Sequence, residues 1–323
     1  MKLLSYIFVL ITRLRNLLYN RRIIKSYKSH SYVISIGNII AGGTGKTPVI
    51  IYLAKLLESE GYKVGIVAGG YRRKSKGLLV VHDVDKLLTT VDKAGDEAYM
   101  IAKEVGCPLV IHDKKYLALI EIDKLFDIDI VLIDDGFQHR KIYRDLDIVI
   151  VNDKTVEEEY LIPAGYLREE KKNLQRVDTI LYRDLAKEIV DFKNKDSFHF
   201  MSKIKTERIV KDKAIVVTAI ANPSNFINFL KENNATIEKV FSFKDHHFFT
   251  DSEIDEIVVY CKSNKIEYIY TTEKDFVKLE KYKLIFEKSS INILSIALEI
   301  LPNDENEFRN YIISKINEKN ITY

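Results

Sequence analysis

The chain has few cysteines, no large excess of either charge and no long apolar run, and each absence removes a class of protein. Its two cysteines, Cys107 and Cys261, both lie within apolar segments of the 323 residues. A disulfide framework and a cysteine zinc cage are therefore excluded, and a reducing compartment is indicated. The 50 Lys and Arg nearly balance the 47 Asp and Glu, for a net charge of +3. The molecule as a whole is therefore not expected to bind polyanions such as nucleic acid.

The apolar run at the N-terminus is too short to cross a bilayer. Residues 3–12 are uncharged, but ten residues of helix extend only about 15 Å, roughly half of a hydrocarbon core. Apolar residues recur at helical spacing here, at Leu3, Leu4, Ile7, Phe8, Ile11, Leu14 and Leu18. Basic residues accompany them, at Lys2, Arg13, Arg15, Arg21, Arg22 and Lys25.

This pattern predicts a basic amphipathic helix that lies on a membrane surface rather than crossing it. Arginines follow the apolar run where a secretory signal would have small residues at a cleavage site, which argues against such a signal. The alternative is a helix that packs on the protein's own core.

The rest of the chain is typical of a folded α/β protein. Hydrophobic residues make up 46% of the sequence, and 323 residues suit two modest domains. Strand-like segments alternate with helical ones, which predicts a parallel sheet flanked by helices and then a smaller α/β unit. The expected strands are 63–68, 108–112, 128–133, 147–151 and 179–182, followed by 214–219, 238–243, 267–270 and 291–298. The expected helices of the second series are 224–232, 251–263 and 274–281.

The predicted organisation has four parts. We expect a surface helix over residues 1–25, a nucleotide-binding domain of the P-loop NTPase type over 26–195, a linker over 196–213 and a smaller α/β domain over 214–323. The last helix is expected to pack back on the first domain. The sequence contains no internal repeat and no low-complexity tract.

A glycine-rich segment, residues 37–48, follows a strand-like stretch and precedes a helical pattern. Its core is Gly42, Gly43, Thr44, Gly45, Lys46 and Thr47. Consecutive glycines let several backbone N–H groups point at one anion, the Lys46 ammonium can reach the β and γ phosphates, and the Thr47 hydroxyl can hold Mg²⁺. The usual spacing of such loops requires a further glycine where this chain has Ile40. The segment nevertheless predicts a binding site for a nucleoside triphosphate.

An apolar strand that ends in two acids has the form of a Walker B strand. Residues 128–133 are mostly apolar, and Asp134 and Asp135 follow them. A carboxylate at the carboxyl end of a buried strand lies near the phosphate loop, where it can hold Mg²⁺ directly or through water. We therefore assign Asp134 or Asp135 to a metal, and the pattern does not determine which of the two touches it directly. The alternative is an Asp-Asp-Gly turn that binds nothing.

Three other polar segments have simpler interpretations as helix starts. The acids of Gly95-Asp96-Glu97 precede a helical run, where negative charge is favourable in any case. Thr250 and Glu253 form a capping box, which leaves the preceding Asp245-His246-His247 unexplained. Residues 271–275, Thr-Thr-Glu-Lys-Asp, are interpreted as a helix cap rather than a catalytic group.

Taken in order, these segments resemble the tetraacyldisaccharide 4′-kinase family, over nearly the whole chain. The resemblance rests on Gly-Asn-x-x-x-Gly-Gly-Thr-Gly-Lys-Thr-Pro at 37–48, Gly-Tyr at 70–71, Gly-Asp-Glu at 95–97, Asp-Asp-Gly-Phe-Gln-His at 134–139, Leu-x-Pro-Ala-Gly-x-Leu-Arg-Glu at 161–169, Asp-His-His at 245–247 and Thr-Thr-Glu-Lys-Asp at 271–275. The strings at 134–139 and 163–169 are the most diagnostic, because neither belongs to phosphate-loop proteins in general.

The resemblance implies an ATP- and Mg²⁺-dependent kinase of lipid A biosynthesis. Such an enzyme phosphorylates the 4′-hydroxyl of tetraacyldisaccharide 1-phosphate to give lipid IVA. Because this glycolipid substrate stays in the membrane, the resemblance also implies a peripheral, monotopic protein at the cytoplasmic face of the bacterial inner membrane. It implies nothing about the oligomeric state.

The family's site residues can be carried over by position. Asp96 with His246 would take the proton from the sugar hydroxyl, with Lys46 and Asp135 as further catalytic residues. The phosphates would be bound by Gly42, Gly43, Thr44, Gly45, Lys46 and Thr47. The metal would be held by Thr47, Asp134 and Asp135, and the substrate site lined by Arg168, Glu169, Gln138 and His139. Since Asp96 and His246 fall in different predicted domains, catalysis would require domain closure.

The chain departs from the family at two places. Many relatives have Ser-Arg-Gly-Tyr where this chain has Ala68-Gly69-Gly70-Tyr71, and an arginine where it has Lys115. We hypothesise that Arg72 and Arg73 replace the first lost charge; full activity in an Arg72→Ala, Arg73→Ala double variant would contradict this.

Two other classes of protein stay open at this point. One is a membrane-associated phosphate-loop ATPase that uses hydrolysis as a switch, which would not need Asp96 and His246. The other is a soluble phosphate-loop ligase or kinase for a small cofactor precursor, in which the N-terminal helix would pack internally.

Overall fold

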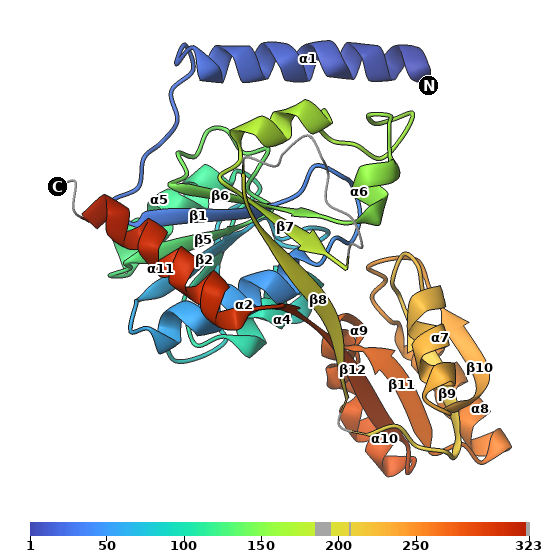
Figure 1. The fold of residues 1–323 in the computed structure, drawn as a ribbon. Helices are drawn as coiled ribbons and strands as arrows, with labels where there is room; N and C mark the ends of the chain where they lie inside the picture. Colours follow the sequence, from blue (N-terminus) through green and yellow to red (C-terminus); the bar gives the residue numbers. More distant parts are fainter. Residues whose placement is uncertain (185–194, 207, 321–323) are drawn as a thin grey trace.

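The computed structural model describes residues 1–184, 195–206 and 208–320 (Figure 1). The first half of the chain after the N-terminal helix α1 (Lys2–Asn20) alternates strands and helices. Its strands are β1 (Tyr32–Gly37), β2 (Val64–Ala68), β3 (Leu79–His82), β4 (Leu109–Ile111), β5 (Ile130–Asp134), β6 (Leu146–Val151) and β7 (Thr179–Arg183). Its helices are α2 (Lys46–Ser59), α3 (Val91–Ala94), α4 (Asp96–Glu104), α5 (Lys115–Leu125), α6 (Asp153–Glu157) and the 3-10 helix η1 (Lys171–Arg176).

The second half contributes further strands and helices. Its strands are β8 (Asp196–Thr206), β9 (Lys213–Thr218), β10 (Thr236–Ser242), β11 (Tyr268–Thr272) and β12 (Asn292–Pro302). Its helices are α7 (Ser224–Glu232), α8 (Asp251–Asn264), α9 (Glu273–Leu279), η3 (Glu280–Tyr282), α10 (Lys283–Lys288) and α11 (Glu305–Asn320). The expected α/β fold class is confirmed.

All described strands belong to one sheet. Its order is β10-β9-β11-β12-β8-β7-β6-β1-β5-β2-β4-β3. The strand β8, which lies where we expected a linker, pairs with β7 in parallel and with β12 antiparallel. The long strands β8 and β12 thereby connect the two halves, and the second half extends away from the first (Figure 1). The last helix, α11, returns to the first half, where Phe308, Ile312 and Ile316 are buried in its core.

The central strands are buried on both faces, which is why they are apolar at nearly every position. Successive residues of a strand point to opposite faces. Thus Ile34 of β1 packs in the same cluster as Leu53 of α2, whereas Val33 packs with Leu119 of α5. The register pairs Ile36 of β1 with Asp134 of β5. The loop after β1 and the acids after β5 therefore meet at one edge of the sheet.

Helix α1 lies across one end of the molecule (Figure 1) and contacts it with polar side chains. Ser5, Thr12 and Asn16 are buried, and the Ser5 hydroxyl donates to the backbone oxygen of Leu161 at 2.9 Å. The outward side chains are apolar: Leu3, Leu4, Ile7, Leu10, Ile11, Leu14 and Leu17 are all exposed. This orientation is the reverse of a helix packed on its own core. Among the described residues, no helix has the length and apolar character needed to cross a membrane.

Candidate active site

The phosphate loop runs from the end of β1 into α2, and two of its glycines are required by backbone geometry. Gly42 and Gly45 have φ of 109° and 89°, in the left-handed region that favours glycine. A Cβ on Gly45 would also lie 2.1 Å from Cδ1 of Ile300. Because α2 begins at Lys46, its free N–H groups point into the loop, as an anion site requires.

The position of the absent glycine has a different structural role. Ile40 is buried and forms an antiparallel bridge with Leu167. Next to it, the Ala41 N–H donates to the backbone oxygen of Tyr166 at 2.7 Å. The first part of the loop is thus held by a strand-like pairing, and only its second part has the glycine-dependent turn.

Asp135 is surrounded by cations. Its carboxylate lies 3.6 Å from Lys46 Nζ and accepts hydrogen bonds from Arg168 at 2.9 Å on both oxygens. Burial opposes its ionisation, but Lys46, Lys115 and Arg168 more than compensate and hold the pKa of Asp135 below its usual range. Asp135 is therefore a permanent anion beside the Lys46 that is expected to meet the phosphates.

Gly69 and Lys115, the two positions where the chain departs from the family, lie next to each other, and Lys115 contacts the backbone of Asp134 and Asp135. The buried Lys115 ammonium donates to the backbone oxygen of Asp134 and, at 3.0 Å, to that of Asp135. A Cβ on Gly69 would lie 3.2 Å from Lys115 Cε, so a side chain at position 69 would require Lys115 to shift. Burial lowers the pKa of Lys115. The residues at 69 and 115 therefore depend on each other and jointly position the acidic turn.

The donor set at this edge fits Mg²⁺. Thr47 is the second residue of α2 and Asp134 the last of β5, so a hydroxyl and a carboxylate face the loop from adjacent elements. Burial raises the pKa of Asp134 to about 6, and the Lys115 charge opposes this effect. Hard oxygen ligands suit Mg²⁺, which takes its remaining ligands from phosphates and water.

A carboxylate–imidazole dyad joins the first half of the chain to the second. His246 Nδ1 is 2.9 Å from both oxygens of Asp96, and both side chains are buried. Asp96 begins α4 in the first half, whereas His246 follows β10 in the second. Burial opposes ionisation of Asp96, but the His246 hydrogen bond and the Lys274 and Lys278 charges lower its pKa overall.

The backbone conformation of His246 indicates a functional role for this dyad. His246 has φ of 62°, a conformation that costs a residue with a Cβ about 1–2 kcal/mol. Its N–H donates to the backbone oxygen of Ala219 at 3.1 Å, which holds the turn. The neighbouring His247 has a structural role, since its ring stacks on Phe243 and its Nε2 lies 2.9 Å from the capping Glu253. The capping box predicted at Thr250 and Glu253 is confirmed.

Two lysines of α9 that the sequence did not single out also reach the dyad. Lys278 Nζ is 2.7 Å from Asp275 and 3.6 Å from Asp96, and Lys274 Nζ is 3.2 Å from His246 Nε2. The predicted cap is present, with the Thr272 hydroxyl accepting from the Asp275 N–H. The sequence feature that could have identified them is their spacing, because two lysines four residues apart lie on one face of a helix.

Glu97 lies between the dyad and the acidic strand end and acts electrostatically on both. Its carboxylate lies 3.4 Å from Lys274 Nζ. On its other side, it is one of the charges that raise the pKa of Asp134, after the larger effect of burial. The dyad therefore acts on the acidic strand end through Glu97, and the acidic strand end contacts the phosphate loop through Asp135 and Lys46.

Three predicted substrate residues lie on the α1 side of this site. Arg168 contacts Asp135, as described, and Gln138 Nε2 donates to the backbone oxygen of Asn38 at 2.7 Å. His139 lines a cavity of about 240 Å³ together with Arg15 and Arg140. Burial, and then the Lys115 charge, lower the pKa of His139 to about 4, so this imidazole is neutral near pH 7.

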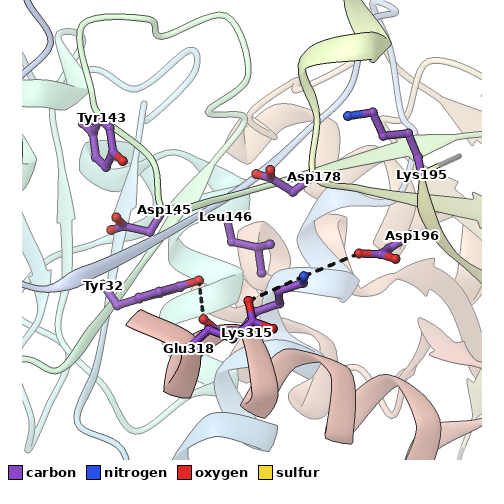
Figure 2. A pocket seen from close by; sticks show the side chains of 9 residues that line it. All are labelled: Tyr32, Tyr143, Asp145, Leu146, Asp178, Lys195, Asp196, Lys315 and Glu318. Carbon is purple, nitrogen blue, oxygen red and sulfur yellow. Dashed lines mark hydrogen bonds and ion pairs between the residues drawn. The ribbon is translucent and has the colours of Figure 1, made fainter. Parts of the chain in front are cut away.

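A larger cavity lies at the other end of the strands. Figure 2 shows its lining residues, which include Tyr32, Leu146 and Asp196, the first residues of β1, β6 and β8. Its volume is about 500 Å³. Because the phosphate loop follows the opposite end of β1, the larger cavity is not the candidate active site.

The two arginines after Gly70 differ in their surroundings. Arg73 is buried and pairs with Asp113 at 3.2 Å, so it stabilises its own loop. Arg72 is exposed and donates to the backbone oxygen of Asp245, next to the dyad. Of the two arginines, only Arg72 contacts the residues around His246 in the described structure. Whether an arginine here replaces the one that many relatives have at position 69 stays a hypothesis.

Glu169 lies at the centre of a buried network that holds α1. Its carboxylate pairs with Arg15 at 2.8 Å and Arg176 at 2.9 Å. It also accepts from Asn16 and Asn173, at 3.3 and 2.9 Å. These partners connect α1 to η1, and a direct role for Glu169 at the substrate stays a prediction.

Replacing Glu169 with Ala is expected to destabilise the protein by about 3 kcal/mol, because two partly buried arginines lose their counter-charge. Urea unfolding would measure this change. Glu170→Ala is the matched control: its ion pair with Arg13 is largely exposed on the arginine side, so the expected loss is at most about 1 kcal/mol. Equal losses in the two variants would contradict the assignment of Glu169 as the anchor.

Comparison with known proteins shows the family to which the chain is similar. The family model described as tetraacyldisaccharide-1-P 4′-kinase, LpxK, matches residues 1–317. A tetraacyldisaccharide 4′-kinase from Halothermothrix orenii is 33% identical over 338 residues, covering 93% of this chain and 88% of the relative. One from Aquifex aeolicus is 32% identical over 296 residues, covering 87% of this chain and 90% of the relative.

A solved structure gives the same result at the level of the fold. The crystal structure of LpxK from Aquifex aeolicus in complex with ATP superimposes with a TM-score of 0.79 at 29% sequence identity, covering 97% of each chain. The chain therefore belongs to the tetraacyldisaccharide-1-P 4′-kinase family.

Proposed function

We propose that this protein transfers the γ-phosphoryl group of ATP to the 4′-hydroxyl of tetraacyldisaccharide 1-phosphate, giving lipid IVA in lipid A biosynthesis. The observation that carries the proposal is the Asp96–His246 dyad. Its neighbour Glu97 acts electrostatically on Asp134, and the next residue, Asp135, lies 3.6 Å from Lys46 of the phosphate loop. A hydrolytic switch has no need of a buried base supplied by two distant segments. An alcohol acceptor does need one, because its hydroxyl proton must leave as the new bond forms.

Each group of site residues has its own role in the phosphoryl transfer. The dyad accepts the proton of the 4′-hydroxyl, whose oxygen bonds to the γ-phosphorus while the bond from that phosphorus to the β-phosphate oxygen breaks and ADP leaves. Lys46 and the N–H groups from Gly42 to Thr47 hold the phosphates and their charge. Arg168 holds Asp135 in place beside Lys46.

Mg²⁺, when bound, neutralises charge on the β and γ phosphates. Thr47 and the acids Asp134 and Asp135 are the residues that would hold it. Lys115 keeps those acids in position from behind through their backbone oxygens.

The surface of α1 supports docking at a membrane. Its exposed leucines and isoleucines would enter the headgroup region, and the flanking basic residues would meet anionic lipids. The cavity lined by Arg15, His139 and Arg140 lies between α1 and the site, where the polar end of a glycolipid would enter. Gln138 and His139 are the proposed lining residues. We place the protein at the cytoplasmic face of the bacterial inner membrane, as a peripheral protein.

The test is transfer of label from γ-labelled ATP to tetraacyldisaccharide 1-phosphate in detergent micelles with Mg²⁺. A labelled lipid product is the expected result. ATP turnover without a lipid product would favour the membrane-associated switch ATPase. A soluble kinase for a small precursor would be indicated if the full chain and a chain lacking residues 1–25 partition equally into the cytosol.

A further inference from the structure

Lys274 has an unusual environment for a lysine near the start of a helix. Its ammonium lies 3.2 Å from His246 Nε2, 3.4 Å from Glu97 and 3.5 Å from Asp245. The same ammonium lies 4.0 Å from Oδ2 of Asp96, the carboxylate member of the dyad. The side chain is only 20% exposed. One lysine of the second half thus contacts both members of the dyad and a carboxylate of the first half.

The helix itself does not require this lysine. Thr272 and Asp275 cap α9, and Asp275 also accepts from the Thr218 hydroxyl and the Ala219 N–H. The fully buried Lys278 balances Asp275 from within the fold. Lys274 is therefore not explained by capping or by the buried network beneath it.

The contact with His246 fixes where the imidazole proton lies. An ammonium group can only donate, so Nε2 of His246 must be the acceptor nitrogen and Nδ1 must carry the proton that it donates to Asp96. A doubly protonated imidazole would place two cations 3.2 Å apart. Burial alone would lower the pKa of Lys274, but Asp96, Glu97 and Asp245 raise it overall, so the lysine stays charged.

We propose that Lys274 is a positioning residue of the phosphoryl-transfer reaction: it selects the neutral Nδ1–H tautomer of His246, which orients the Asp96 carboxylate to accept the proton. This rests on the proposed function. The charged and titratable groups that face the pair are Asp96 and Glu97 of α4, Tyr71 and Arg72 after β2, Asp245 in the turn, and Asp275 and Lys278 of α9. Because the carboxylates would favour the imidazolium, the cations oppose it, and of these cations Lys274 is the one that contacts Nε2.

The first experiment compares Lys274→Met with Lys103→Met. Lys103 also bridges the halves, through an ion pair with Glu280, but it makes no contact with the dyad among the described interactions. We expect Lys274→Met to lower kcat by about 10- to 100-fold, with KM for ATP nearly unchanged. The pH profile of kcat should also change in Lys274→Met, because a positive charge 3.2 Å from His246 Nε2 is removed. Lys274→Arg should restore the wild-type profile, and Lys103→Met should keep it.

The second experiment does not depend on turnover. Imidazole ¹⁵N shifts, assigned with His246→Gln, should show the Nδ1–H tautomer in the wild type and loss of that single tautomer in Lys274→Met. Unchanged ¹⁵N shifts in a folded Lys274→Met variant, or equal kinetic losses in Lys274→Met and Lys103→Met, would reduce Lys274 to a contact between the halves and overturn the proposal. A wild type that fails to phosphorylate lipid while the ¹⁵N result holds would instead count against the proposed function.

Discussion

Asp96→Asn is expected to lower kcat for lipid phosphorylation by about 10²- to 10⁴-fold, the range in which a general base contributes. Asparagine has nearly the same shape, so the buried site should stay filled. It cannot take a proton, however, and its neutral oxygen is a weaker partner for His246 Nδ1, 2.9 Å away. Initial rates of label transfer in micelles, with Mg²⁺ in excess, would measure the loss.

A comparison with Lys46→Met distinguishes loss of the general base from loss of nucleotide binding. Asp96 has no predicted contact with the phosphates, so Asp96→Asn should bind a fluorescent ATP analogue almost as well as the wild type. Lys46→Met should lose both binding and turnover, because the cation at the phosphate loop is removed. If Asp96→Asn retained wild-type kcat, the proton would have to leave by another route and the dyad would be structural.

The double substitution Leu10→Glu, Leu14→Glu is expected to weaken binding to anionic lipid vesicles by at least about 100-fold. The two leucines are 63% and 58% exposed on the outward face of α1. Each inserted leucine is worth about 1.5–3 kcal/mol, so losing two removes at least about 3 kcal/mol, or two orders of magnitude in affinity. Cosedimentation with vesicles of phosphatidylglycerol and phosphatidylethanolamine would measure the change.

The second half offers a matched control for this experiment. Val259 and Leu284 are 61% and 69% exposed, and Val259→Glu, Leu284→Glu adds the same charge far from α1. This control should bind vesicles like the wild type. Both double variants change exposed positions, so their unfolding midpoints should match. Unchanged vesicle binding by the α1 variant would show that the apolar face of α1 is not the membrane contact.

Much of the fold could be predicted from the sequence because it depends on local patterns. The strand and turn from Tyr32 to Lys46 are determined by an apolar run, glycines and the helix that follows. The capping box at Thr250 and Glu253 spans only four residues. Neither requires knowledge of what the rest of the chain does, and both appear where predicted.

The pairing of β8 could not be predicted in the same way. Residues 196–213 are polar and were expected to link two domains, yet Phe200 pairs with Arg183 on one side and Pro302 on the other. Arg183 is near in the sequence, but the pairing that joins the two halves depends on Pro302 and its strand, about 100 residues further along the chain. Local composition does not contain that information.

By itself, then, the sequence determined the phosphate loop, the acidic strand end, the amphipathic first helix and the family. The tertiary structure decided what individual side chains do. Asp96 reads locally as a helix-start charge, but the fold places it against His246, 150 residues away. Lys274 reads as part of a cap, but it contacts that same imidazole. The physical reason is that propensity and periodicity act between neighbours along the chain, whereas the protonation and partners of a buried group depend on every charge around it in space.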